Sequence, residues 1–232
     1  MNNEKNIPFC DACCIDQSIF KKLSKNEKDI LSYEKNCNRY EKGETVYGEG
    51  TRVSGIYCIN KGIIKHYKTG NDGKEQIIRF SKQGDIFGFR SILSQEPACT
   101  TTKVIDQAVI CFIPASVFLN LIKENPAFAM AVIKLSCVEL GEANKYILDI
   151  AQKNVRERLA EILLLLNDNF GTNATGDLNI FLTREELASI VGTATESVIR
   201  LLSEFKKDKL IELNKRKIRL LDVTKLKRIS EI

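Results

Sequence analysis

The segment Leu182–Leu202 constrains this chain most, because its capping residues, its glycine and its apolar positions define two short helices joined by a tight turn. Thr183 and Glu186 have the spacing of a capping box, which predicts that the first helix begins after Thr183. Gly192 can adopt the left-handed conformation that ends such a helix. Thr195 is a candidate N-cap for the second helix, whose inward face is predicted to contain Val198, Leu201, Leu202 and Phe205. This combination is typical of a helix-turn-helix.

The second predicted helix carries polar side chains that are free to contact a partner, because they lie outside its apolar positions. Arg200 can donate two hydrogen bonds to guanine, and Glu196 can accept one from cytosine. Arginines, hydroxyls and backbone amides at a helix N-terminus suit DNA phosphates. The residues predicted to contact DNA are Thr183, Arg184, Thr193, Thr195, Glu196, Ser197, Arg200 and Arg216. The alternative is a plain helical hairpin whose charged face is only solvated.

A basic hairpin is predicted directly after these two helices. Short apolar runs at about 211–213 and 218–221 flank the turn Asn214–Lys217, which contains three cations. Such a hairpin is typical of the wing of a winged domain, whose cations meet DNA phosphates. The net charge of +5 suits a phosphate-bearing partner, but many proteins of this charge bind no nucleic acid. The motif therefore carries the prediction, and the net charge does not.

The region from about Asn38 to Pro114 has a different pattern, in which glycines separate short strand-like runs. Asn71-Asp72-Gly73 is a tight-hairpin signal, because these residue types tolerate the positive φ of primed turns. Many short strands with frequent turns predict a β-sandwich or barrel. With 232 residues, of which 44% are hydrophobic, the chain is long enough for two modest domains.

From Pro126 to about Ala151 the pattern is helical. We call the residues that recur there at alternating spacings of four and three the seam: Ile133, Cys137, Leu140, Asn144, Ile147 and Ala151. A seam of this kind predicts a dimer-forming coiled coil, in which the Asn fixes pairing and register. A helix that packs only on its own domain would give the same stripe. A second, richly apolar helix is predicted at about Val155–Asn167.

Over nearly every segment, the chain resembles the Crp/Fnr family of bacterial regulators. The DNA motif of that family is matched at Arg184, Glu185, Ala188, Gly192, Glu196, Ser197, Val198 and Arg200. The resemblance implies an α+β fold with an N-terminal cyclic-nucleotide-binding-type β-roll (jelly roll), a long dimerisation helix and a C-terminal winged helix-turn-helix. The implied segments are a Cys-containing N-terminus (1–24), the β-roll sensor (25–125), the dimerisation helix (126–152) and the winged helix-turn-helix (153–232).

The resemblance also implies a function. Such a chain would be a homodimeric transcription regulator that binds a pseudo-palindromic operator and RNA polymerase, with Glu196 and Arg200 as the base readers. Thr195 stands where some relatives have Arg, and Ile199 stands where oxygen-sensing relatives have Ser. Both departures leave the operator sequence open.

Other classes of protein are disfavoured by what the sequence lacks. There is no nucleophile–base–orienter set and no phosphate-binding glycine loop, so we expect no enzyme activity. The N-terminus has no secretory signal and the apolar stretches are too short to span a bilayer, so we expect a cytoplasmic protein without a membrane partner. Two alternatives stay open. One is an Fe–S or thiol metalloprotein whose primary activity is redox chemistry, and the other is a small-ligand-binding module without DNA activity.

The branches of the family differ in the residues that bind the ligand of the sensor domain. Cyclic-nucleotide-binding members carry Gly-Glu and Arg-Ser/Thr pairs where this chain has Gly88-Phe89 and Cys99-Thr100. Losing the carboxylate and the guanidinium removes charge-assisted hydrogen bonds, so cyclic AMP is not the expected ligand. Arg90 lies nearby in the sequence and could compensate. The residues predicted to line an effector pocket are Gly88, Phe89, Arg90, Cys99 and Thr100.

The cysteine positions are closer to the oxygen-sensing Fnr branch, in which four cysteines ligate a [4Fe–4S] cluster. The matching residues are Cys10, Cys13, Cys14 and Cys111, although the third ligand of the family aligns with Ile19. A thiol role without a cluster stays open. In a reducing cytoplasm no disulfide framework is expected, and Cys37, Cys58, Cys99 and Cys137 are predicted to be core thiols. His66, the sole histidine, is expected at the surface or satisfied in the core, although it could in principle ligate haem.

Overall fold

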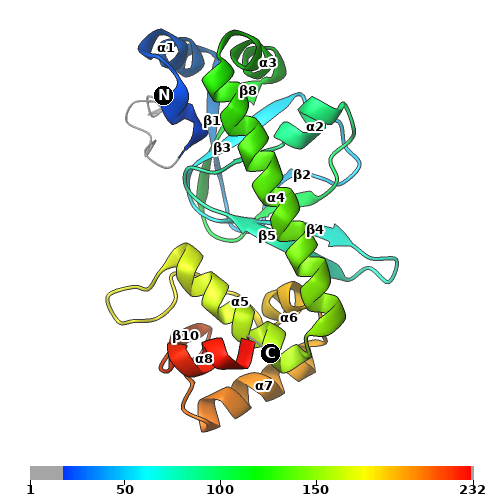
Figure 1. Ribbon diagram of the computed structural model, residues 1–232, viewed down its shortest axis with the longest axis vertical. Helices are drawn as coiled ribbons and strands as arrows, with labels where there is room; N and C mark the ends of the chain where they lie inside the picture. The colour runs from blue at the N-terminus through cyan, green and yellow to red at the C-terminus, as the bar shows by residue number, and fades with distance from the viewer. Residues whose placement is uncertain (1–17, 231–232) are drawn as a thin grey trace, which may run out of the picture. The chain divides into compact units, whose positions relative to one another are not determined.

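The computed structural model describes residues 18–230 and has an α+β fold (Figure 1). Contacts divide the chain into two compact units. The first contains Met1–Gly73 and Ile78–Leu140, and the second contains Lys74–Ile77 and Gly141–Ile232. Within the described residues, every helix is too short or too polar to span a bilayer.

The strands that precede Ala115 form two four-stranded sheets. One sheet has the order β1-β8-β3-β6, with the bounds Asn36–Tyr40, Ala108–Pro114, Gly55–Lys61 and Ile86–Phe87. The other has the order β2-β7-β4-β5, with the bounds Thr45–Tyr47, Thr101–Val104, Ile64–Thr69 and Glu75–Ser81. The predicted turn lies between β4 and β5, where Gly73 has a φ of 80°. The prediction of a β-sandwich is therefore confirmed.

Hydrophobic clusters cover both faces of the β1-β8-β3-β6 sheet. The inner cluster joins it to the other sheet through Ile59, Ile64, Phe87, Val104, Ala108 and Ile110. The outer cluster joins it to η2 (Ile19–Lys22), α1 (Lys25–Glu34), α2 (Phe89–Ser94), α3 (Ala115–Glu124) and the first turns of α4 (Pro126–Gln152). In the outer cluster Phe128 of α4 packs on the rings of Phe20 and Phe118, with centroids 5.9 and 6.0 Å away. Burying such a side chain contributes roughly 1.5–3 kcal/mol, so these rings fix the start of α4 on the sheet.

His66 is a buried residue whose two ring nitrogens both have partners. Its Nε2 lies 2.9 Å from Ser81 Oγ, and its Nδ1 lies 3.2 Å from Thr102 Oγ1. Burial, together with the charge of Arg79, holds the pKa of His66 well below its usual value. The ring is therefore neutral and satisfied, as the core alternative predicts, and neither nitrogen is left for haem.

The prediction for the cysteines was wrong at three of four core positions. Cys37 is not a thiol, because its Sγ is bonded to Cys111 Sγ. The two residues face each other across β1 and β8, with Cα atoms 3.9 Å apart, although 74 positions separate them in the sequence. Cys99 is only half-buried and Cys137 is exposed. Cys58 is buried as predicted.

The second unit contains the end of α4 and five further elements up to β10, followed by a last helix. Their bounds are Val155–Phe170 for α5, Arg184–Val191 for α6, Thr195–Lys207 for α7, Ile211–Asn214 for β9, Lys217–Leu220 for β10 and Val223–Ser230 for α8. Helix α5 is the centre of this unit. It buries Leu159, Leu163 and Leu166, and its predicted end at Asn167 is extended to Phe170. The α6 and α7 helices with the β9–β10 hairpin form a winged helix-turn-helix, as predicted.

Candidate nucleic-acid interface

Helix α6 begins and ends as its sequence predicts. Thr183 Oγ1 accepts a hydrogen bond from the Glu186 amide, and the Glu186 carboxylate accepts one from the Thr183 amide, which completes the capping box. At the other end Gly192 is left-handed, with φ 71° and ψ 52°. Its amide donates to the carbonyl of Ala188, which is buried. These local interactions place the turn between the two helices.

Helix α7 begins differently from the prediction. Thr195 is its first residue and not its cap, and the residue at the cap position is Ala194, which makes no side-chain hydrogen bond. The error arises because Thr at this point satisfies the sequence rule, whereas the chain enters the helix one residue earlier. An alanine cap leaves amides in the first turn without a side-chain acceptor. Such amides are suited to a phosphate oxygen.

The two faces of α7 separate cleanly. Val198, Leu201, Leu202 and Phe205 are buried, as predicted. The opposite face exposes Glu196, Ile199, Arg200 and Ser203, which have the spacing of one helical face. Glu196 and Arg200, the predicted base readers, thus lie on the same exposed surface. Ile199 is 48% exposed between them, and an apolar side chain there can contact the methyl group of thymine.

The β9–β10 wing closes through the two residues Lys215 and Arg216, so each strand is shifted slightly from its predicted bounds. Arg216 is exposed at its tip. Arg184, predicted as a phosphate contact, donates from Nη2 to the carbonyl of Lys215 at 3.0 Å. Its Nη1 is buried without a hydrogen-bond partner among the described residues, and burial lowers the pKa of its guanidinium. Arg184 thus ties the start of α6 to the tip of the wing.

The remaining predicted DNA residues lie near the turn. Thr193 follows Gly192 and its amide donates to the Ala188 carbonyl at 3.1 Å. Ser197 donates its amide to the carbonyl of Ala194. Both side chains are half-buried. They can approach a phosphate only through their hydroxyls.

Arg158 of α5 supports the turn between α6 and α7, a role that was not predicted for it. Its guanidinium donates to three carbonyls, those of Lys153 at 2.7 Å, Val191 at 2.9 Å and Gly192 at 3.2 Å. Hydrogen bonds to a charged group contribute more than neutral ones, on the order of 1.5–3 kcal/mol each. The sequence gives no signal for this role, because the three acceptors are backbone atoms.

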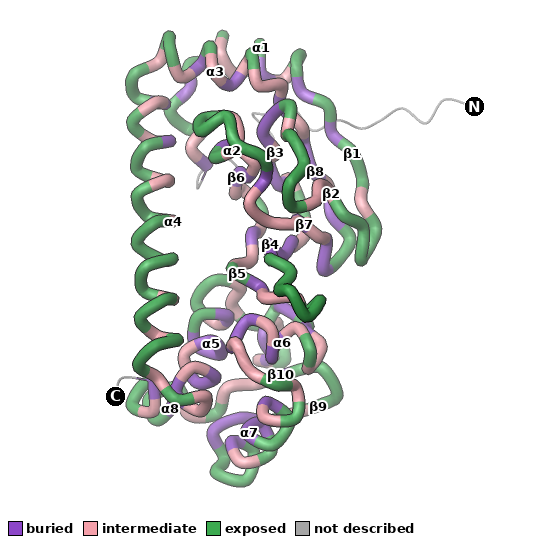
Figure 2. Tube along the Cα trace, turned by 90° about the vertical axis from the view of Figure 1, so that its right-hand side faces the viewer, coloured by how far each residue is buried: buried purple, intermediate pink, exposed green. Residues whose placement is uncertain are grey.

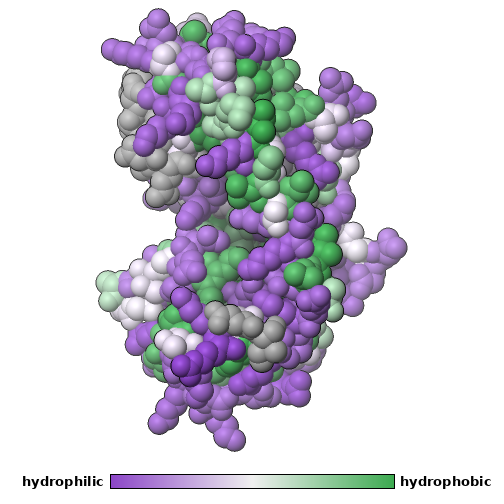
Figure 3. Space-filling model, in the orientation of Figure 1, coloured by the Kyte–Doolittle hydropathy of each residue, from purple (hydrophilic) through white to green (hydrophobic). Residues whose placement is uncertain are grey.

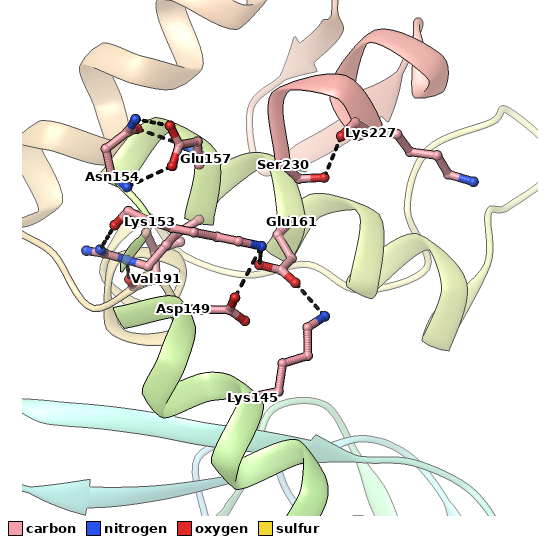
Figure 4. A network of polar contacts seen from close by, with 10 residues as sticks. Lys145, Asp149, Lys153, Asn154, Glu157, Glu161, Val191, Lys227 and Ser230 are labelled. Atoms are coloured by element: carbon pink, nitrogen blue, oxygen red, sulfur yellow. Dashed lines mark hydrogen bonds and ion pairs between the residues drawn. The ribbon is translucent and has the colours of Figure 1, made fainter. Parts of the chain in front are cut away.

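An ion-pair network joins the end of α4 to α5 (Figure 4). Glu161 accepts from Lys145 Nζ at 2.6 Å and from Lys153 Nζ at 2.7 Å, and Lys153 also lies 3.2 Å from Asp149. Burial alone would raise the pKa of Glu161, but its hydrogen bonds to the two lysines outweigh burial and lower it. Burial would likewise lower the pKa of Lys153, and its acidic partners raise it instead.

All six seam residues of α4 are exposed. Figure 2 shows that much of α4 is coloured as exposed. Leu140 and Ile147 keep 63% and 66% of their surface, so their own chain does not cover them. The face that packs on the first unit is instead the one with Phe128 and Val132. Figure 3 shows apolar side chains interspersed along the course of α4 in the view of Figure 1. Val138 and Leu148, which lie beside the seam, are also exposed and widen this apolar face.

The predicted effector residues are only partly brought together. Gly88 is the left-handed N-cap of α2, and Thr100 is half-buried near the start of β7. Phe89 is 3% exposed and belongs to the outer cluster. A glutamate carboxylate that binds a ribose hydroxyl would not fit in this apolar position. Arg90 Nη1 lies 3.2 Å from Cys99 Sγ, which places a guanidinium beside the position where the family carries its arginine.

The predicted cluster ligands do not form a metal site in the described part of the chain. Cys10, Cys13 and Cys14 lie outside the described residues. Cys111 Sγ is bonded to Cys37, whereas an iron–sulfur ligand must be an unbonded thiolate. Among residues 18–230, no group of three His, Cys, Asp or Glu residues is arranged to hold a metal ion. In the disulfide state, therefore, the residues present do not fit a four-cysteine cluster.

Comparisons with known proteins match both units. Residues 37–125 match the family described as "Cyclic nucleotide-binding domain", and residues 157–229 match the "Crp-like helix-turn-helix domain". Electron transport regulator A of Shewanella oneidensis is 28% identical over 184 residues, which cover 78% of this chain and 73% of that protein. The fumarate and nitrate reduction regulatory protein of Vibrio cholerae is 25% identical over 229 residues, which cover 96% and 90%.

Solved structures match the fold as well. FixK2 from Bradyrhizobium japonicum superposes with a TM-score of 0.78 at 23% identity, over 85% of this chain and 98% of that one. A CooA mutant from Carboxydothermus hydrogenoformans superposes with a TM-score of 0.76 at 26% identity, over 93% and 97%.

Proposed function

We propose that this chain, which belongs to the Crp/Fnr family of non-enzymatic, DNA-binding transcription regulators, acts as a homodimer on a pseudo-palindromic duplex and passes a redox, gas or small-molecule signal from its β-roll to its recognition helices. The single observation that carries the DNA assignment is the exposed pair Glu196 and Arg200 on a helix whose other face is buried. We further propose a cytoplasmic location and RNA polymerase as a partner.

In the proposed complex α7 lies in the major groove. Arg200 donates to guanine O6 and N7, and Glu196 accepts from cytosine N4. The amides at the start of α7 and the cations of the wing contact phosphates and so fix the position of the helix. Two copies of α7 separated by roughly 34–36 Å would contact successive major grooves.

The proposed dimer forms along the seam. Its exposed apolar residues need a partner surface of the same kind, and a second copy of α4 supplies one. Asn144 at an a position would pair with its counterpart and fix the register. Cys137 lies in the seam and is exposed, so a short bismaleimide should cross-link two copies there. The Cys137→Ser variant is the control, and an uncross-linked wild-type chain at micromolar concentration would contradict the seam.

The signal is proposed to be a redox one. The names of the relatives refer to the regulation of electron transport and of fumarate and nitrate reduction, which are redox processes. Anaerobic purification followed by iron and sulfide analysis tests whether a cluster is bound through Cys111 in a reduced chain. Addition of cyclic AMP in a thermal melt tests the ligand that the residues at 88–89 and 99–100 disfavour.

The experiment that tests the function is selection of bound duplexes from a random pool, with and without oxygen. We expect a pseudo-palindromic sequence whose binding weakens steeply as salt rises. A chain that selects no sequence at any salt concentration, but is stabilised by a small molecule, would instead be a ligand-binding module.

A further inference from the structure

Three cysteines lie in one row across the β1-β8-β3 part of the first sheet. Cys37 is directly opposite Cys111 across β1 and β8, and Cys58 is directly opposite Cys111 across β8 and β3. Directly opposed residues of antiparallel strands point to the same face, so the three sulfurs share the face that the outer cluster covers. All three side chains are buried, with 8%, 3% and 7% of their surface exposed.

We propose that Cys37, Cys111 and Cys58 form a thiol–disulfide exchange centre, in which Cys111 is bonded either to Cys37 or to Cys58. The compartment comes from the proposed function, whereas the chemistry does not depend on DNA binding. Disulfides in a reducing cytoplasm are seldom structural and are mostly transient or redox-sensing. While Cys111 is bonded to Cys37, it cannot also ligate the iron–sulfur cluster that the family resemblance implies.

The geometry suits exchange at the central sulfur. The Cys58 thiolate attacks Cys111 Sγ, the bond between Cys58 and Cys111 forms, and the bond between Cys111 and Cys37 breaks. Cys37 leaves as a thiolate and takes up the proton that Cys58 released, so no electrons are gained or lost. Displacement at sulfur needs the attacking and leaving groups on opposite sides of the central atom. Strand β8 lies between β1 and β3, so Cys37 and Cys58 stand on opposite sides of Cys111, which is the arrangement that such a displacement uses.

Formation of the first disulfide needs an oxidant. We assign this role to a small-molecule disulfide, which accepts two electrons and two protons from Cys37 and Cys111 and leaves as two thiols. Cys37 lies on β1, the edge strand of its sheet, so it is the member of the row nearest to an approach from outside.

Exchange would change the support of α4. Cys58 belongs to the same hydrophobic cluster as Phe128 and Val132, the two buried residues of that helix. A bond from Cys111 to Cys37 ties β8 to the edge strand, and a bond to Cys58 ties it to β3 beneath this cluster. Both the position of the disulfide in the row and its reduction to thiols would therefore alter the support of the helix that carries the seam.

Peptide mapping tests the exchange directly, because trypsin places each cysteine on its own peptide, 36–39, 53–61 or 104–123. The full-length chain is reduced, incubated with mixtures of reduced and oxidised glutathione, alkylated and digested. We expect the wild type to give mainly the 36–39 peptide linked to 104–123, with a minor share of 53–61 linked to 104–123, and the Cys37→Ser variant to give only the second of these links. The Cys58→Ser variant, the matched control, should keep only the first link.

Two results would overturn the proposal. One is a Cys37→Ser chain that folds, as judged by circular dichroism, and forms no link between 53–61 and 104–123 under oxidation. The other is a wild-type Cys111 that stays a thiol or links to a cysteine outside the row.

Duplex affinity is measured separately on the same samples. We expect the oxidised and reduced wild type to differ by about fivefold or more, and Cys111→Ser to abolish the difference. Equal affinities of the two wild-type states would remove the link to α4, whereas binding by neither state would count against the proposed function alone.

Discussion

Two exposed helical faces differ in kind. The seam face of α4 is apolar, with Ile133, Leu140 and Ile147 open to solvent, whereas the exposed face of α7 is mostly polar and charged. Exposure of an apolar face of this size to water is unfavourable unless another apolar surface covers it. A charged face is stable in water and binds only where a partner offers complementary hydrogen bonds. The contrast supports the proposal that α4 pairs with another copy of the chain and that α7 binds DNA.

The largest effect is expected from a substitution that disrupts the apolar face of α4. Leu140→Glu places a charge in the middle of the seam, so we expect a monomer in analytical ultracentrifugation. A monomer loses the second half-site, and duplex affinity should fall by about 100-fold or more. Lys134→Glu introduces the same side chain at another exposed position of α4 outside the seam and should leave a dimer. A dimeric Leu140→Glu chain with unchanged affinity would show that the apolar face serves another purpose.

The next largest effect is expected from a substitution on the exposed face of α7. Arg200→Ala removes a bidentate donor, so affinity for the selected duplex should fall by roughly 5- to 150-fold, which corresponds to about 1–3 kcal/mol. Selectivity should relax at one base pair. Lys206→Ala, on the same helix nearer its end, should weaken all duplexes evenly and leave selectivity intact. Unchanged operator selectivity in Arg200→Ala would exclude this side chain as a base reader.

A smaller effect sharpens the comparison at the helix starts, since α6 has a complete capping box and α7 has none. Ala194→Asp supplies the missing acceptor, so the free energy of unfolding should rise by about 1 kcal/mol. Affinity for duplex should fall at the same time, because the new carboxylate competes with phosphate. Ala194→Ser caps without charge and should stabilise with less loss of binding. An Asp variant that binds as tightly as the wild type would show that phosphate does not approach this terminus.

The smallest effect concerns the network that connects α4 to α5. Hydrogen bonds from Lys145 and Lys153 lower the pKa of Glu161 below its unfolded value of 4.5, so its stabilisation is complete above that pH. It is lost as pH falls through the lowered value. We expect denaturant titrations between pH 6 and 3 to lose less stability in Glu161→Gln than in the wild type. Parallel curves for the two proteins would mean that the network contributes nothing measurable.

Local rules predicted part of the fold and of the interface. The capping box at Thr183, the left-handed turn at Gly192 and the buried positions of α7 depend on neighbours in the sequence, and all three were correct. The Cys37–Cys111 bond and the contact of Arg158 with three carbonyls depend on strand register and on packing between helices. Neither leaves a periodic trace in the sequence. The predicted N-cap of α7 was wrong for a third reason. Thr195 has the better capping side chain, but the helix begins one residue earlier and the cap position is held by Ala194.

The tip of the wing has a conformation that a lysine seldom adopts. Lys215 has a φ of 55°, where glycine or asparagine would be less strained, and its carbonyl is held by Arg184. A glycine would ease the bend but would remove a positive charge from the outermost point of the hairpin. The chain keeps the cation, and the hydrogen bond from Arg184 to the Lys215 carbonyl supports the bend, so a positive charge is presented at the tip of the wing.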